Sequence, residues 1–121
     1  MLMSDFSFFQ EARQFALNEL LISTIHHQYV HQRVLHNLSQ IEMGMTLLNA
    51  TKLIMEDAIT GNADLIGWSW LYHYYVEMSL RITQRQFCQT VNLDDRTIRR
   101  YQNNTIDQLT RQLIRMEQNA R

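Results

Sequence analysis

The chain has 121 residues with a formal net charge of −1, and 45% of its residues are hydrophobic and 19% charged. This length predicts a single domain, and this composition excludes an intrinsically disordered chain. The one cysteine, Cys88, excludes an internal disulfide and a multi-cysteine metal cluster. The sequence has no basic leader and no run of about 18 apolar residues, so we expect a soluble cytoplasmic protein without a membrane span.

Charge is divided unevenly along the chain. Residues 1–81 carry four basic and eight acidic groups, whereas residues 82–121 carry seven arginines and four acidic groups. We therefore expect one domain, 1–121, made of an acidic helical scaffold over 1–81 and a basic segment over 82–121. Positive charge gathered in one segment is what a nucleic-acid-binding surface requires.

The backbone contains few residues that interrupt helices. There are no prolines and only three glycines, and Leu, Gln, Met, Arg and Glu are frequent. These features predict an all-α fold of five to six helices.

Helical periodicity begins near Ser7, which forms a capping-box pattern with Gln10. An apolar stripe follows as far as Ile22, and a second stripe runs over residues 25–38. The two are either one helix or two helices that meet near Ser23 and Thr24.

The next helix is expected to begin at Ser39, which forms a capping box with Glu42. Gly61 would end it. Its apolar positions are Ile41, Met45, Leu48, Leu53, Ile54 and Ala58.

An aromatic-rich helix is predicted over residues 65–80, capped by Asn62 or Asp64. Its large side chains point in several directions, which favours a central, buried element. The alternative is that one aromatic face binds a partner. These side chains are Trp68, Trp70, Leu71, Tyr72, Tyr74, Tyr75, Val76 and Met78.

Residues 83–101 contain two short helical patterns around a tight turn. Thr83 with Gln86 is a capping box for the first, and Asn92 tolerates the left-handed conformation that such a turn needs. Asp94 or Asp95 would cap the second.

The apolar residues of this segment form an expected wedge between the two helices and the core. The small Cys88 is expected to be buried where the helices approach most closely, as a packing residue. The wedge residues are Phe87, Val91, Leu93, Ile98 and Tyr101.

This segment resembles the helix-turn-helix units of bacterial transcription regulators, especially the sigma-factor region 4 and response-regulator output type. It agrees with their pattern at Thr83, Gln86, Phe87, Val91, Leu93, Thr97, Ile98 and Arg99, and departs from it at Cys88, Asn92 and Asp94. The resemblance covers about one sixth of the chain and implies that the second helix enters the major groove of double-stranded DNA. The expected DNA-binding residues are Arg85, Arg96, Thr97, Arg99, Arg100 and Asn103. Gln102 adds a neutral donor and acceptor, whereas Asp94 and Asp95 count against tight binding.

Apolar residues continue at steps of three and four after Tyr101, through Ile106, Leu109, Leu113 and Met116. We expect this seam either to pack on the first helices or to form a homodimer. Residues 103–105 would break the helix if Thr105 and Gln108 cap a new one.

No constellation for catalysis or metal binding stands out. His27 and His31 lie one helical turn apart, but zinc needs three or four ligands and no further ligand is indicated. Cys88 has no indicated base, and no phosphate-binding loop is present. We expect a protein that is not an enzyme and uses no cofactor or metal.

Two functions are compatible with these patterns. The leading hypothesis is a non-catalytic DNA-binding domain of a transcription regulator or of a larger signalling protein. The alternative is a protein-interaction or dimerisation module that retains a helix-turn-helix fold and docks through the aromatic helix and the acidic face.

Overall fold

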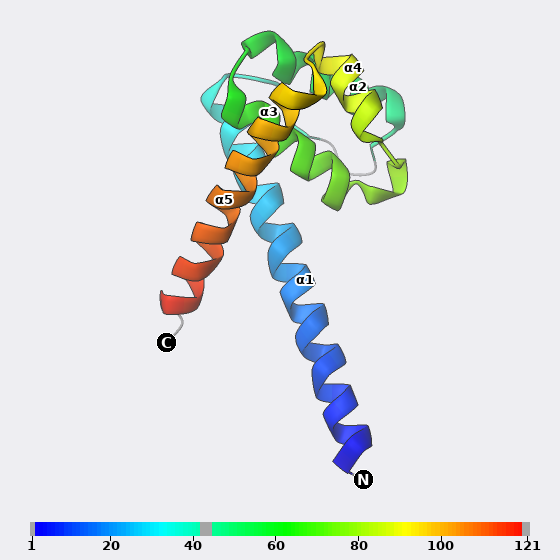
Figure 1. Ribbon diagram of the computed structural model, residues 1–121, viewed down its shortest axis with the longest axis vertical. Coiled ribbons are helices and arrows are strands. Elements are labelled where there is room, and N and C mark those ends of the chain that lie inside the picture. The colour runs from blue at the N-terminus through cyan, green and yellow to red at the C-terminus, as the bar shows by residue number, and fades with distance from the viewer. Residues whose placement is uncertain (1, 42–44, 120–121) are drawn as a thin grey trace.

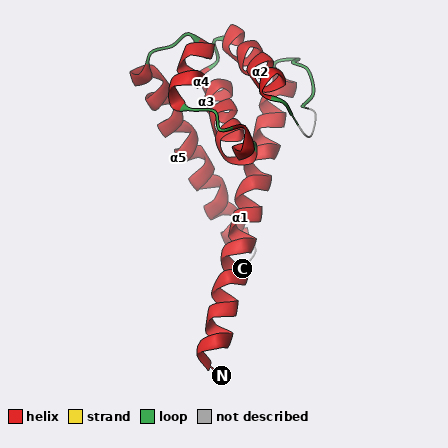
Figure 2. Ribbon diagram, turned by 90° about the vertical axis from the view of Figure 1, so that its right-hand side faces the viewer, coloured by secondary structure: helices red, strands yellow, loops and turns green. Residues whose placement is uncertain are grey.

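The computed structural model describes residues 2–41 and 45–119, with side chains from Gln10 onward. The described chain has no strand and contains five α-helices (Figures 1 and 2), which confirms the expected all-α fold of five to six helices. The helices are α1 (Leu2–Leu35), α2 (Leu47–Thr60), α3 (Ala63–Leu71), α4 (Gln84–Val91) and α5 (Asp95–Asn119). None of these helices is both long enough and apolar enough to cross a membrane.

Helix α1 is one continuous helix of 34 residues. The predicted start at Ser7 is wrong because the helix already begins at Leu2. No break occurs at Ser23 and Thr24, since the Thr24 hydroxyl donates to the Leu20 carbonyl at 2.7 Å and stays within the helix. The N-terminal part of α1 projects away from the other helices (Figures 1 and 2).

The cap of helix α2 lies seven residues after the predicted cap, Ser39. This cap is Thr46, whose hydroxyl accepts from the Asn49 amide at 3.2 Å. Ser39 and Ile41 precede the helix, and Glu42 lies outside the described residues. The predicted end is confirmed, because Gly61 adopts a left-handed conformation with φ 66°.

Helix α3 is capped by Asn62, whose side chain accepts from the Leu65 amide at 2.9 Å. The predicted continuous helix to Leu80 is wrong, because the chain changes to a π-helical turn over Tyr72–Val76 and a 3₁₀ turn over Met78–Leu80. The Glu77 amide donates to the Tyr72 carbonyl at 3.1 Å, and the Tyr72 hydroxyl donates to the Glu77 carboxylate at 3.0 Å. Two contacts between the same two residues thus close the wider turn.

The core has two clusters that share α2 and α3 as a centre. One joins α1 and the middle of α5 through residues such as Ile25, Trp68 and Leu109. The other holds α4 and the start of α5, through Ile54, Ile66, Phe87, Val91 and Ile98. The expectation of a buried aromatic helix is confirmed for Trp68 and Tyr72, whereas Tyr74 and Tyr75 are exposed.

Helices α3 and α5 cross closely at Gly67. A Cβ atom at this position would overlap the Thr105 hydroxyl and lie 3.0 Å from the Tyr101 carbonyl oxygen. Thr105 is buried and its hydroxyl donates to that same carbonyl at 2.9 Å, within an unbroken α5. The alternative of a helix break over residues 103–105 is therefore wrong, and α5 packs on α3 as one helix.

Candidate nucleic-acid interface

The turn between α4 and α5 has the predicted geometry. Thr83 and Gln86 form a reciprocal capping box, with N···O distances of 3.1 and 2.9 Å. Asn92 adopts the left-handed conformation with φ 56°, and the following Leu93 amide donates to the Cys88 carbonyl at 3.2 Å. These bonds satisfy backbone groups at both ends of a helix of only eight residues.

The start of α5 is capped by Asp94, which accepts from the Thr97 amide at 2.7 Å. The hydrogen bonds from Thr97 lower the pKa of the Asp94 carboxyl below its ordinary value, because they favour the ionised form. Asp94 is therefore held as an anionic cap at the helix N-terminus, where negative charge is favoured.

The apolar wedge is present as expected. Phe87, Val91 and Ile98 are buried against α2 and α3, and Leu93 and Tyr101 pack beside them. Cys88 differs from the prediction, because it is half-buried instead of enclosed. Partial burial and the nearby Asp95 and Asp94 carboxylates raise its pKa, so the thiol stays protonated at neutral pH.

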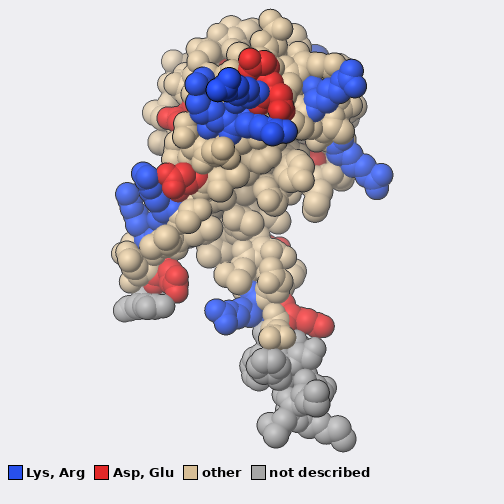
Figure 3. Space-filling model, in the orientation of Figure 1, with Lys and Arg blue, Asp and Glu red and all other residues tan. Residues whose placement is uncertain are grey.

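The structure brings the predicted DNA-binding residues together at the start of α5, apart from Arg85, which lies on α4. Figure 3 shows basic side chains gathered over the first turns of α5, with acidic side chains beside them. Arg96, Arg100 and Asn103 are exposed at i, i+4 and i+7, on one side of the helix. Arg85 and Arg99 are also exposed, and Thr97 is half-buried.

The arginines differ in their partners. The Arg99 Nε atom lies 2.8 Å from Asp95, which also accepts from the Gln84 side chain at 3.3 Å. The Arg100 guanidinium lies 6.0 Å from the centre of the Tyr101 ring. Arg99 is thus partly neutralised by its own helix, whereas Arg96 and Arg100 form no ion pair within the described chain.

Gln102 is not part of this exposed face. It is buried, and its amide group donates to the Gln84 side chain at 2.7 Å. The expectation that it adds a donor and acceptor for DNA is wrong, because the residue instead joins α5 to α4. Gln102 and Asn103 are consecutive residues, so their side chains point about 100° apart around the helix axis.

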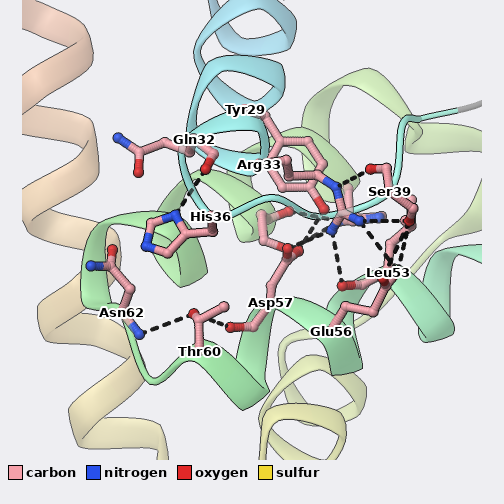
Figure 4. Close-up of polar contacts among 12 residues, drawn as sticks. Tyr29, Gln32, Arg33, His36, Ser39, Leu53, Glu56, Asp57, Thr60 and Asn62 are labelled. Atoms are coloured by element: carbon pink, nitrogen blue, oxygen red, sulfur yellow. Dashed lines mark hydrogen bonds and ion pairs between the residues drawn. The ribbon is translucent and has the colours of Figure 1, made fainter.

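A second cluster of polar side chains lies inside the protein (Figure 4). The sequence did not indicate it. The Arg33 guanidinium lies 2.6 Å from Asp57 and 3.2 Å from Glu56, and the Tyr29 hydroxyl donates to Asp57 at 2.5 Å. Burial raises the pKa of Asp57 to about 6, against the opposing hydrogen bonds from Tyr29 and from Arg33. Asp57 therefore remains ionised at neutral pH, and the pair is formed.

His73 lies at the edge of this cluster, with its ring centre 5.7 Å from that of Tyr29. Its Nδ1 atom is 2.7 Å from the Ser69 carbonyl oxygen, and Nε2 has no hydrogen-bond partner among the described residues. Burial lowers the pKa of His73 to about 4, so the ring is neutral at pH 7. Arg33, Asp57 and His73 are all at most 2% exposed, so these three side chains are enclosed by the fold.

The described residues contain no group of three or more histidine, cysteine or acidic side chains that could hold a metal ion. His27 and His31 thus have no third ligand within this part of the chain. Comparisons with protein-family models, with curated proteins and with solved structures found no match to the chain.

Proposed function

We propose that the protein binds double-stranded DNA through the helix-turn-helix unit of α4 and α5, and that it acts by binding alone. The observation that carries this proposal is the exposed face of α5, where Arg96, Arg100 and Asn103 point outward while Ile98 anchors the opposite side. A rigid helix with outward guanidinium groups fits the major groove, which is about 12 Å wide.

The proposed DNA contacts differ with the chemistry of each side chain. Arg96 and Arg100 would donate paired hydrogen bonds to guanine edges or hold phosphates, and the Asn103 amide suits an adenine edge. Arg85, at the start of α4, would hold a flanking phosphate. Asp94 and Asp95 repel phosphates, so we expect modest affinity that falls steeply with salt.

A salt titration tests the proposal directly. Binding of a fluorescent mixed-sequence duplex is followed by anisotropy at increasing salt, for the full chain and for R96A/R100A. The double variant should bind at least about tenfold more weakly at low salt and show a log–log slope shallower by about 0.9 for each lost phosphate contact. R111A/R115A is the matched control, because Arg111 and Arg115 are exposed arginines of the same helix with the same i, i+4 spacing, outside the turn.

Two results would contradict DNA binding by this face. One is no measurable affinity at low salt for the folded chain. The other is an equal loss of affinity in R111A/R115A and in R96A/R100A, which would indicate attraction to the overall charge instead of recognition by the turn.

A specific observation also supports docking to another protein as a second candidate function. The π-helical turn holds Tyr74 half exposed, stacked on Trp70 with ring centres 5.5 Å apart, and Tyr75 lies against it at 5.1 Å. Exposed aromatic side chains of this kind are enriched at protein interfaces. Retained DNA binding in Y74A/Y75A would show that this surface is not needed for the first function.

A further inference from the structure

An apolar groove of about 730 Å³ lies between the N-terminal half of α1 and the C-terminal part of α5. The two helices diverge from the globular end of the molecule, as Figure 1 shows. Each wall of the groove is mainly aliphatic. The apolar lining residues are Leu17, Leu20 and Leu21 from α1, and Leu113, Ile114 and Met116 from α5.

The α1 wall has almost no support from the rest of its own chain. Residues 10–20 are all exposed, over eleven consecutive positions. A helix without tertiary contacts is marginal in water even when its sequence favours helix formation. The projecting part of α1 therefore needs a partner to be stable.

This part of α1 is apolar on two opposite sides. Residues two apart on a helix are separated by about 200° around its axis, so Phe15 lies opposite Leu17, and Ile22 lies opposite Leu20. Phe15 is 67% exposed and Leu17 is 50% exposed. A helix that is apolar on opposite sides is normally held between two other helices.

We propose that the groove is filled by α1 of a second copy of this chain. A groove with two apolar walls needs an occupant with two apolar sides, and the projecting half of α1 has that property. The exchange is reciprocal, so one twofold axis satisfies both grooves and closes the assembly. In this arrangement the Leu17 sides of the two α1 helices meet each other, and each Phe15 side meets α5 of the partner.

The size of the contact fits a stable dimer. Residues 10–22 rise about 20 Å, and a helix of about 11 Å diameter then has a lateral surface of roughly 700 Å². About half of this surface, on the two apolar sides, would face the partner, and the α5 wall of the groove adds to it, so the two copies together would bury about the 1,000 Å² that a specific interface needs.

Sedimentation equilibrium of the full chain at about 100 µM tests the proposal, with L17E for one side of α1 and F15E for the other. The unchanged protein should have twice the 14.5 kDa mass of one chain. Each variant should raise the dimer dissociation constant at least about tenfold, because a charge would enter an apolar contact. I59E is the matched control, since Ile59 is 84% exposed on α2.

Trp68 is buried and Trp70 is partly buried in the core, so tryptophan fluorescence reports whether each variant is folded. A monomer at 100 µM would overturn the proposal. So would a dimer weakened by L17E alone and unaffected by F15E, because the sandwich needs both sides of α1. Hydrogen exchange gives a second test without substitutions, in which protection of residues 10–22 should rise with protein concentration.

Discussion

Arg33 and Asp57 form an ion pair in the interior, where each charge depends on the other for its solvation. Both are at most 2% exposed, and Asp57 also accepts from the Tyr29 hydroxyl. Removing one partner leaves an uncompensated buried charge, which is more costly than the loss of the contact itself. The pair therefore fixes how α1 packs against α2. The sequence did not indicate it, because the two residues lie far apart along the chain.

Substitution of Asp57 should reveal this requirement. D57A is expected to lower the free energy of unfolding by about 3 to 5 kcal/mol, because the buried Arg33 charge keeps only the partly exposed Glu56 as a counter-charge. Urea denaturation of the unchanged and substituted proteins measures the difference. D107A removes an exposed i, i+4 pair with Arg111 and should cost less than about 0.5 kcal/mol; a similar loss in both variants would contradict the argument.

The buried groups also predict how stability depends on pH. The pKa of His73 is lowered to about 4, so its favourable contribution is complete above pH 6.5 and is lost as the pH falls toward 4. The pKa of Asp57 is raised to about 6, so protonation favours the folded state as the pH falls through 6. The two effects oppose each other between pH 4 and 6.

The variant H73Q should separate them. The unchanged protein should lose up to about 3 kcal/mol relative to H73Q between pH 7 and pH 4, because only its folded state resists protonation of the ring. Urea denaturation at several pH values measures this difference. The exposed variant H31Q is the control, and its pH dependence should parallel that of the unchanged protein. A constant difference between H73Q and the unchanged protein would contradict the buried neutral histidine.

Asp95 lowers the positive charge of the exposed face of α5, because it forms an ion pair with Arg99 at 2.8 Å. If this face binds DNA, D95N should raise affinity about three- to tenfold at low salt and make the salt dependence steeper by about one phosphate contact. The change frees Arg99 and removes a carboxylate that repels phosphate. D107N is the matched control, because it frees Arg111 at a distance from the turn. Weaker binding by D95N would show that the carboxylate itself contacts a base.

At the scale of the elements, the crossing of α3 and α5 depends on Gly67. G67A should lower the free energy of unfolding by about 1 to 3 kcal/mol, because the added methyl overlaps Thr105 at an already close contact. Alanine favours a helix by about 1 kcal/mol over glycine, so a net loss isolates the packing effect. The double variant G67A/T105A, followed by thermal or urea unfolding, should recover part of the loss. A stability gain in G67A would show that the helices separate freely.

The helix ends that could be predicted are those fixed by short-range contacts. Thr83 with Gln86, Asn62 and Gly61 act within a few residues, so their patterns were sufficient. Ser39 has the same type of pattern, but its hydroxyl is bound to Arg33 and Glu56, and the helix begins at Leu47 instead. The tertiary contacts of Ser39 therefore outweigh its local capping pattern.

The candidate site shows the same division. The turn and the wedge follow from local spacing, and the exposure of Arg96 and Arg100 follows from the helical period. The bonds from α4 to Gln102 and to Asp95, both made by Gln84, depend on how α4 lies against α5. The Arg99–Asp95 pair is instead an i, i+4 contact within α5. The π-helical turn after Leu71 was also not predictable, because such turns are rare and the pattern of these residues is that of an ordinary α-helix.

At the scale of the whole molecule, the proposed dimer joins α1 and α5 at one end while the helix-turn-helix lies at the other, globular end (Figure 1). Dimerisation should therefore couple to stability by mass action. A tenfold rise in protein concentration should add about 1.4 kcal/mol per dimer to the free energy of unfolding. Thermal unfolding at 5, 50 and 500 µM measures the shift in midpoint, which should be smaller in L17E and unchanged in I59E.

The same variant distinguishes dimerisation from DNA recognition. L17E leaves α4, the turn and the start of α5 unchanged, so each molecule should keep the salt dependence of a single site. A dimer engages two sites with one molecule, and linking two sites raises overall affinity well beyond that of either alone. L17E should therefore bind a long duplex more than about tenfold more weakly than the unchanged protein, but bind a duplex with room for one α5 helix equally well. Anisotropy measured with both duplexes tests this prediction. If L17E and the unchanged protein bind the long duplex equally well, the dimer does not contribute to DNA binding. That result would leave both the proposed dimer and the proposed DNA site standing as separate properties.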